Sequence, residues 1–341
     1  MGNKIKFRIT DYIEFDLAWE EEQCKKLGVD FSHHQMKTAE PEELVETFKD
    51  ADILLVNMAR MNAEVMAGLD NVKVMLRHGI GYDNFDLDAA TKHGIVCANQ
   101  PTASSEDVAE QAIMLMLAAY RKINIQKSIL ATSVEHGAWK FDPIFPMYRM
   151  GGKTLGIVGC GNIGSYMLRK MRTFGMNILV DDPYLSKERY EELGIEHTPL
   201  ETVLKESDII TIHVPVTDET RGMFNMDAFK QMKKTAVLVN TARGPMVNVD
   251  DLAVALKEGI IAGAGIDVYD KEPPGPDYPL LGVDNAVLTP HLAWYSEEGG
   301  IDIRHTIMDD VERFLDGKLP KAVINPDVLS SPALKMKFKD M

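Results

Sequence analysis

Four short motifs in the second half of the chain carry side chains suited to binding and protonating a small anion. They are His213-Val214-Pro215, Asn240-Thr241-Ala242-Arg243-Gly244, Asp267 to Glu272-Pro273, and Thr289-Pro290-His291. An arginine binds a carboxylate through two parallel hydrogen bonds and keeps its charge at any ordinary pH. A histidine exchanges a proton near neutral pH, and a neighbouring carboxylate favours its charged form. Arg243, Glu272 and His291 are therefore the candidate catalytic residues.

A glycine-rich turn precedes these motifs. Gly159-Cys160-Gly161-Asn162-Ile163-Gly164 follows an apolar strand-like run and opens a helical stretch, which is the context that the dinucleotide-binding fingerprint requires. The amides of Asn162 and Ile163 at the start of that helix would donate to a pyrophosphate. The candidate cofactor-binding residues of this turn are Gly159, Gly161, Asn162, Ile163 and Gly164.

Asp182 lies 23 residues after Gly159 and ends the next strand-like run. A carboxylate about 20 residues after such a turn bonds the adenosine ribose hydroxyls of a dinucleotide. It would also repel a 2′-phosphate, and no arginine occurs in the next six residues, so the sequence favours NAD over NADP. The alternative is that Asp182 is a solvated turn residue before Pro183.

Short apolar runs alternate with helix-like stretches along most of the chain. The expected strands are Ile5–Ile9, Ile53–Val56, Val72–Leu76 and Ile95–Ala98, followed from Lys153 onward by Leu155–Val158, Ile178–Asp181, Ile209–Val214, Ala236–Asn240, Gly263–Val268 and Ala286–Thr289. This alternation predicts right-handed parallel crossovers, and hence an α/β protein with two doubly wound parallel-sheet domains. Ligands of such sheets bind at the carboxyl ends of the strands.

Two longer helices are expected at the domain boundaries. One covers Val108–Ile125 and is apolar on nearly every face, and the other covers Ser296–Leu315 and is expected to return to the first domain. The first domain would then be discontinuous and flavodoxin-like, comprising residues 1–101 and 295–341. A Rossmann cofactor domain, residues 102–294, would be inserted in it.

The composition excludes several classes of partner. Lys and Arg number 37 against 52 Asp and Glu, and the net charge of −15 disfavours nucleic acid and anionic membranes. No apolar run approaches the 18 or so residues of a membrane span. Cys24, Cys97 and Cys160 show no metal-like spacing and fit a reducing compartment, so we expect small core residues in a cytoplasmic protein.

In their order and spacing, the motifs closely resemble the D-isomer-specific 2-hydroxyacid dehydrogenase family over nearly the whole chain. The resemblance implies an NAD-dependent enzyme that interconverts a small 2-oxo acid and its 2-hydroxy acid. His291 would be the acid for reduction and the base for oxidation, Glu272 would hold the imidazole, and Arg243 would bind the carboxylate. No metal is required, because histidine and arginine supply the acid and the electrophile.

The same resemblance assigns further residues. Asp267 looks like the family's nicotinamide-side carboxylate, and His213, Pro215 and Thr241 look like the lining of the cofactor crevice. The run from Arg77 to Asn84 is similar to the family's substrate-carboxylate loop, in which glycines let backbone amides approach an anion. The substrate candidates in this loop are Arg77, Gly79, Ile80 and Gly81.

The segment after His291 departs from the commoner family ending T-P-H-I-G-G. It reads H-L-A-W-Y-S and resembles the C-terminal binding protein branch, in which the tryptophan lines the substrate pocket. Trp294 is thus a substrate candidate or a domain-packing residue. That branch also suggests an alternative function, an NAD(H)-responsive interaction protein. A second alternative is formate dehydrogenase, which has a similar architecture but pairs its histidine with glutamine.

The identity of the acid stays open among 3-phosphoglycerate, glycerate or glyoxylate, and branched or aromatic 2-oxo acids. The apolar helix from Val108 and the segment Trp139–Met150 suggest buried surface beyond one subunit. Together with the family's dimers, this predicts a homodimer formed through the Rossmann domain.

Overall fold

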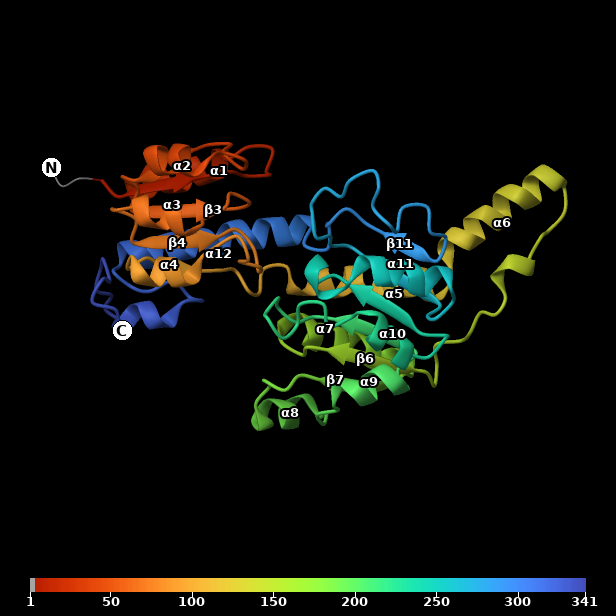
Figure 1. Cartoon of the computed structure of the whole chain (residues 1–341). Helices are drawn as coiled ribbons and strands as arrows, with labels where there is room; N and C mark the ends of the chain where they lie inside the picture. The colour runs from red at the N-terminus through yellow and green to blue at the C-terminus, as the bar shows by residue number, and fades with distance from the viewer. Residues whose placement is uncertain (1–3) are drawn as a thin grey trace. The chain divides into compact units, whose positions relative to one another are not determined.

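The computed structural model describes residues 4–341 and divides into two compact units. Unit 1 contains the described residues up to Ser104 together with Ser296–Met341, and unit 2 is Ser105–Tyr295. Each unit is an α/β structure around one parallel sheet (Figure 1). The predicted fold class is therefore confirmed.

Unit 1 has a five-stranded parallel sheet in the order β2-β1-β3-β4-β5, which is the flavodoxin-like order. Its strands are β1 (Lys6–Ile9), β2 (Asp30–His33), β3 (Ile53–Val56), β4 (Val74–Arg77) and β5 (Val96–Ala98). Its helices are α1 (Ala18–Leu27), α2 (Pro41–Phe48), α3 (Ala63–Gly68), α4 (Leu87–Lys92), α12 (Glu297–Leu315) and the 3-10 helix η4 (Pro326–Ser330). Helices α1 and α12 share one apolar core with the sheet, and α2, α3 and α4 share the other.

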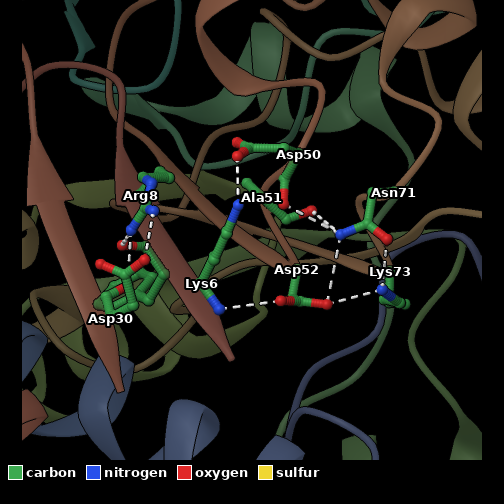
Figure 2. A network of polar contacts seen from close by, with 9 residues as sticks. Lys6, Arg8, Asp30, Asp50, Ala51, Asp52, Asn71 and Lys73 are labelled. Carbon is green, nitrogen blue, oxygen red and sulfur yellow. Dashed lines mark hydrogen bonds and ion pairs between the residues drawn. The ribbon is translucent and has the colours of Figure 1, made fainter. Parts of the chain in front are cut away.

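A network of ion pairs ties together the amino ends of β1, β3 and β4 (Figure 2). Nζ of Lys73 lies 2.6 Å from Oδ1 of Asp52, and the amide of Lys6 donates to Oδ2 of the same carboxylate at 2.8 Å. The side-chain amide of Asn71 donates to the carbonyl of Asp50 at 3.0 Å. These contacts hold the amino ends of three parallel strands together. The Arg77 loop lies at the other end, where the strands have their carboxyl ends.

Unit 2 has a six-stranded parallel sheet in the order β11-β10-β9-β8-β6-β7. The strands are β6 (Thr154–Val158), β7 (Asn177–Asp181), β8 (Ile209–Ile212), β9 (Val237–Asn240), β10 (Gly263–Ile266) and β11 (Ala286–Leu288). All six match the strands predicted for this half of the chain. Beyond β7, His197 forms an isolated parallel bridge with Val180.

The helices of unit 2 cover both faces of its sheet. They are α5 (Ser105–Tyr120), α6 (Ile123–His136), α7 (Asn162–Met171), α8 (Lys187–Leu193), α9 (Leu200–Glu206), α10 (Met226–Gln231) and α11 (Val249–Lys257), with 3-10 turns η1 (Asp142–Ile144), η2 (Arg172–Phe174) and η3 (Gly244–Met246). Helices α5 and α7 pack on one face, and α9, α10 and α11 pack on the other. Among the helices of the described chain, none has the length and apolarity of a membrane span.

The helix expected over Val108–Ile125 is not continuous. Helix α5 ends at Tyr120, and α6 begins at Ile123 after Lys122 adopts a left-handed backbone with φ of 56°. The prediction was wrong here because the apolar pattern runs through the break. The second long helix agrees with its prediction: the Ser296 hydroxyl caps α12 by accepting from the Gly299 amide at 2.8 Å.

Candidate active site

The three glycines after β6 have three different surroundings. A Cβ on Gly159, whose φ is +89°, would lie 2.7 Å from the carbonyl oxygen of His213, and a Cβ on Gly164 would lie 2.1 Å from the carbonyl oxygen of Gly159. A Cβ on Gly161 would meet no atom within 4 Å. The first and third glycines therefore permit the turn and the close packing of α7, and the second leaves open space before the helix. This is the division of roles in a dinucleotide-binding turn.

Asp182 lies against this turn. Its Oδ2 accepts from the amide of Cys160 at 2.8 Å, and its Oδ1 accepts from the amide of Tyr184 at 3.2 Å. The first arginine beyond it, Arg189, pairs with Glu192 at 2.6 Å and donates to the Ser165 hydroxyl at 3.3 Å. The carboxylate is thus held at the mouth of the glycine turn by backbone amides.

Two buried polar atoms lie at the ends of neighbouring strands β8 and β9. Nδ1 of His213 and Oγ1 of Thr241 are buried, and within the described residues neither has a hydrogen-bond partner. Burial lowers the pKa of His213 to about 3, so its ring is neutral at physiological pH. Buried polar atoms normally have hydrogen-bond partners, so a bound ligand with a donor and an acceptor would supply the two that are missing here. Pro215 follows at an exposed position of the same rim.

His291 and Glu272 form a close pair. Nδ1 of His291 donates to Oε2 of Glu272 at 2.6 Å, and the amide of Tyr269 donates to Oε1 of Glu272 at 3.0 Å. Burial alone would raise the pKa of Glu272, but the hydrogen bond and charge of His291, the Tyr269 amide and the charge of Arg243 outweigh it and lower that pKa. The carboxylate is therefore ionised at neutral pH and accepts the hydrogen bond of His291.

Asp267 supports the loop that carries His291. It is fully buried, its Oδ1 accepts from the Thr289 hydroxyl at 2.5 Å and the Leu292 amide at 3.2 Å, and its Oδ2 accepts from the Ala293 amide at 3.0 Å. His291 has a left-handed backbone with φ of 53°. Such a backbone is costly for a residue other than glycine and persists where its surroundings enforce it. The hydrogen bonds of the Asp267 carboxylate help to hold this backbone conformation.

Arg243 begins the η3 turn after β9. The side chain of Asn240 shapes this turn by donating to the Arg243 carbonyl at 2.8 Å and accepting from the Ala242 amide at 3.0 Å. A Cβ on Gly244 would lie 2.2 Å from the carbonyl carbon of Tyr269, so only glycine lets this turn approach the segment after β10. The charge of Arg243 is close enough to lower the pKa of Glu272. The structure thus gathers all three candidate catalytic residues at the carboxyl ends of β9, β10 and β11.

The Arg77 loop lies at the carboxyl end of β4 in unit 1. Gly79 has φ of 140°, its amide donates to the Arg77 carbonyl at 2.9 Å, and the side chain of Asn99 donates to the carbonyl of Ile80 at 2.6 Å. Nη1 of Arg77 contacts Oδ1 of Asn57 at 3.4 Å and the carbonyl of His78. Gly81 continues the loop at a partly exposed position.

Two side-chain contacts involve His78 of the Arg77 loop and the substrate candidate Trp294. Nε2 of His78 lies 2.9 Å from Oε1 of Glu14, with both side chains largely buried. Burial would raise the pKa of Glu14, but its bond to His78 and the charge of that ring lower it to about 2. Trp294 is half-buried and meets the ring of Tyr295 edge-on at 5.3 Å between centroids.

Comparison with known proteins agrees with this geometry. Residues 113–293 match the model of the NAD binding domain of D-isomer specific 2-hydroxyacid dehydrogenases. A glyoxylate reductase of Korarchaeum cryptofilum is 37% identical over 94% of this chain and 92% of its own length. The chain belongs to this family. It is accordingly an NAD-dependent oxidoreductase of the D-2-hydroxyacid dehydrogenase family.

Two further relatives show the range of the family. A D-3-phosphoglycerate dehydrogenase of Archaeoglobus fulgidus is 39% identical over 83% of this chain, and the chain spans only 53% of that protein's length. The structure of a D-lactate dehydrogenase from Aquifex aeolicus, complexed with NAD and lactic acid, superposes with a TM-score of 0.80 at 28% identity. It covers 91% of this chain and 96% of the other.

Several contacts of the site carry no signal in the sequence. The Tyr269 hydroxyl, the Gln111 side chain that donates to the Thr289 hydroxyl at 3.2 Å, and the Glu14 partner of His78 are examples. Gln111 and Glu14 lie outside the recognisable motifs. Tyr269 lies inside the Asp267 to Glu272-Pro273 motif, but the motif does not indicate the contact of its hydroxyl. Within the described residues, no group of three or more His, Cys, Asp or Glu side chains could hold a metal ion.

Proposed function

We propose that this protein reduces a small 2-oxo acid to the D-2-hydroxy acid with NADH, and catalyses the reverse reaction with NAD. The observation that carries the proposal is the 2.6 Å pair of His291 and Glu272 with the charge of Arg243 beside it, in the unit that holds the glycine turn. A proton donor and an anion-binding cation at one rim are what carbonyl reduction of an acid needs.

The chain's own residues have separate tasks in this reaction. When bound, NADH supplies the hydride that adds to the C2 carbonyl carbon. Arg243 binds the substrate carboxylate and places positive charge near the carbonyl oxygen as negative charge develops there. His291 gives its proton to that oxygen, and Glu272 stabilises the imidazolium before the transfer. In oxidation, neutral His291 takes the hydroxyl proton back.

We expect NAD to bind to the glycine turn, Asp182, and the buried polar atoms of His213 and Thr241. Asp182 would bond the adenosine ribose, and the Asn162 and Ile163 amides would bond the pyrophosphate. Asp267 contributes by holding the His291 loop at the nicotinamide side. Residues 102–294 would then form the cofactor domain, and residues 1–101 and 295–341 the substrate domain. Our substrate-binding candidates are Arg77, Gly79, Ile80 and Gly81 of the loop in unit 1 for the carboxylate, and Trp294 of unit 2 for an apolar part of the acid.

Replacing Gly161 by alanine is expected to weaken NADH binding while leaving the fold intact. The new methyl group would meet no protein atom within 4 Å, yet it would occupy the space in front of the helix amides where the pyrophosphate is expected. Loss of one or two charge-assisted hydrogen bonds raises the dissociation constant roughly 10- to 100-fold. Gly151→Ala is the matched control, because a Cβ there also meets no atom within 4 Å. Equal NADH affinity in both variants, measured by fluorescence titration, would contradict the proposal.

We further propose a homodimer through unit 2. Large apolar side chains are exposed on α6 and the segment after it, including Leu130 at 54%, Val134 at 74%, Trp139 at 66% and Phe145 at 69%. Exposed apolar surface of this extent marks an interaction site. Sedimentation at micromolar concentration is expected to give twice the chain mass of 38.1 kDa. A monomeric mass there would overturn this part of the proposal.

The experiment for the function is NADH oxidation at pH 7 with a panel of acids: glyoxylate, hydroxypyruvate and its phosphate, pyruvate, and branched and aromatic 2-oxo acids. Turnover of at least one acid supports the proposal and narrows the substrate. Tight NADH binding with no acid reduced would contradict it.

We also propose that the protein is cytoplasmic. Its cysteines are free and buried in apolar cores, which supports this setting.

A further inference from the structure

Tyr269 touches each of the three loops that carry the candidate catalytic residues. Its hydroxyl donates to the Thr289 carbonyl at 2.7 Å, and its amide donates to Oε1 of Glu272 at 3.0 Å. Its carbonyl carbon lies 2.2 Å from the place where a Cβ on Gly244 would sit, so the Arg243 turn rests against it. The contacts to Glu272 and to the Arg243 turn are made by the backbone of Tyr269, so only the bond to the Thr289 carbonyl requires a tyrosine side chain.

The Thr289 carbonyl that receives this bond also receives the amide of His291, at 3.1 Å. That second bond closes the tight turn in which His291 adopts its left-handed backbone. The Tyr269 ring is nearly buried, and burial together with the charges of Asp267 and Glu272 raises the pKa of Tyr269 to about 12. The hydroxyl therefore stays protonated and remains a donor throughout the working pH range.

We infer that the Tyr269 hydroxyl is a positioning group for proton transfer: by fixing the Thr289 carbonyl, it holds His291 in the geometry of its bond to Glu272. The inference rests on the proposed acid–base role of His291. Tyr269 itself does not exchange a proton in the reaction. Among the charged groups of unit 2, Glu272 bonds the His291 ring, Arg243 acts on the Glu272 carboxylate, and Asp267 accepts from the Leu292 amide next to His291.

The test is Tyr269→Phe, which keeps the ring and removes the hydroxyl. Loss of one buried hydrogen bond is expected to lower kcat for reduction about three- to tenfold at pH 7. The alkaline limb of the kcat/KM profile should move to lower pH, because a loosened Glu272 contact stabilises the protonated acid less. The NADH dissociation constant should stay within about twofold of wild type, since the glycine turn is untouched.

Tyr278→Phe is the matched control. Tyr278 is the other ring of the same aromatic pair, with centroids 5.1 Å apart, and its replacement leaves the Tyr269–Thr289 bond in place. A wild-type alkaline limb in Tyr269→Phe, or an equal shift in both variants, would overturn the inference while leaving the proposed function standing. Full activity in His291→Gln would overturn the acid–base role of His291 and this inference with it, whereas NADH binding without reduction of any acid would overturn the proposed function itself. Melting temperature and far-ultraviolet dichroism confirm that each variant is folded.

Discussion

Replacing His291 by glutamine is expected to lower kcat for reduction of the 2-oxo acid by roughly 10²- to 10⁴-fold, the usual worth of a positioned general acid. Glutamine keeps a hydrogen-bonding side chain of similar reach but cannot deliver a proton to the developing alkoxide. NADH affinity should change little, because the glycine turn and Asp182 follow β6 and β7 at one side of the sheet, whereas His291 follows β11 at the other. The loss should therefore appear in kcat at saturating NADH.

The pH dependence sharpens this expectation. In wild type, the rate of reduction should fall as rising pH removes the proton of the imidazolium, and the rate of oxidation should rise over the same range. Glu272, whose pKa is lowered, is ionised on both sides of this change and does not itself produce the limb. The limb should vanish in His291→Gln. His136→Gln, at an exposed position of α6 in the same unit, is the control and should keep both rate and profile. A residual limb in His291→Gln would assign the proton to another group.

The second large effect is expected at Arg243. Arg243→Lys keeps the charge but loses the planar fork that binds a carboxylate bidentately, so kcat/KM for the acid should fall roughly 10²- to 10³-fold. Part of the loss should appear in KM, because the same guanidinium binds the ground-state carboxylate. Lysine also lacks the reach to donate to the Ala242 carbonyl, which Nη1 of Arg243 contacts at 2.7 Å.

Arg221→Lys is the control for the arginine replacement. Arg221 is exposed in unit 2. Burial raises the pKa of Asp270, which is close to Glu272 in the sequence, and the charge of Arg221 opposes part of that rise. The charges that lower the pKa of Glu272 itself are those of His291 and Arg243. Replacement of Arg221 should therefore leave kcat/KM within about twofold of wild type. Similar losses in both variants would show that the effect is not specific to bidentate binding of the acid by Arg243.

The sheets were predictable because their strands are short apolar runs between polar stretches. All six strands of unit 2 and four of the five in unit 1 follow this signal. Strand β2, Asp30–His33, was not predicted, because it is a half-buried edge strand that pairs with β1 and has a single apolar residue, Phe31. The break after α5 was also missed, since Lys122 takes a left-handed backbone that its residue type does not announce.

The site was predictable to the extent that its residues end buried strands. Parallel strands bring the ends of β9, β10 and β11 to one edge, so the sequence alone placed Arg243, Glu272 and His291 near one another. The contacts that hold them there were not predictable. The hydrogen bonds of the Tyr269 hydroxyl and of the two Asp267 carboxylate oxygens depend on loop conformations that no local pattern specifies.

The most direct measurement follows deuterium from NADH that carries two deuterium atoms at C4 of the nicotinamide into the product formed from a 2-oxo acid such as hydroxypyruvate. The proposed reaction predicts one deuterium on C2 of a hydroxy acid of D configuration, formed roughly 10²- to 10⁴-fold more slowly by His291→Gln at the same enzyme concentration. A product that carries no deuterium on C2 or has the L configuration, or NADH binding without any product across the panel, would contradict it.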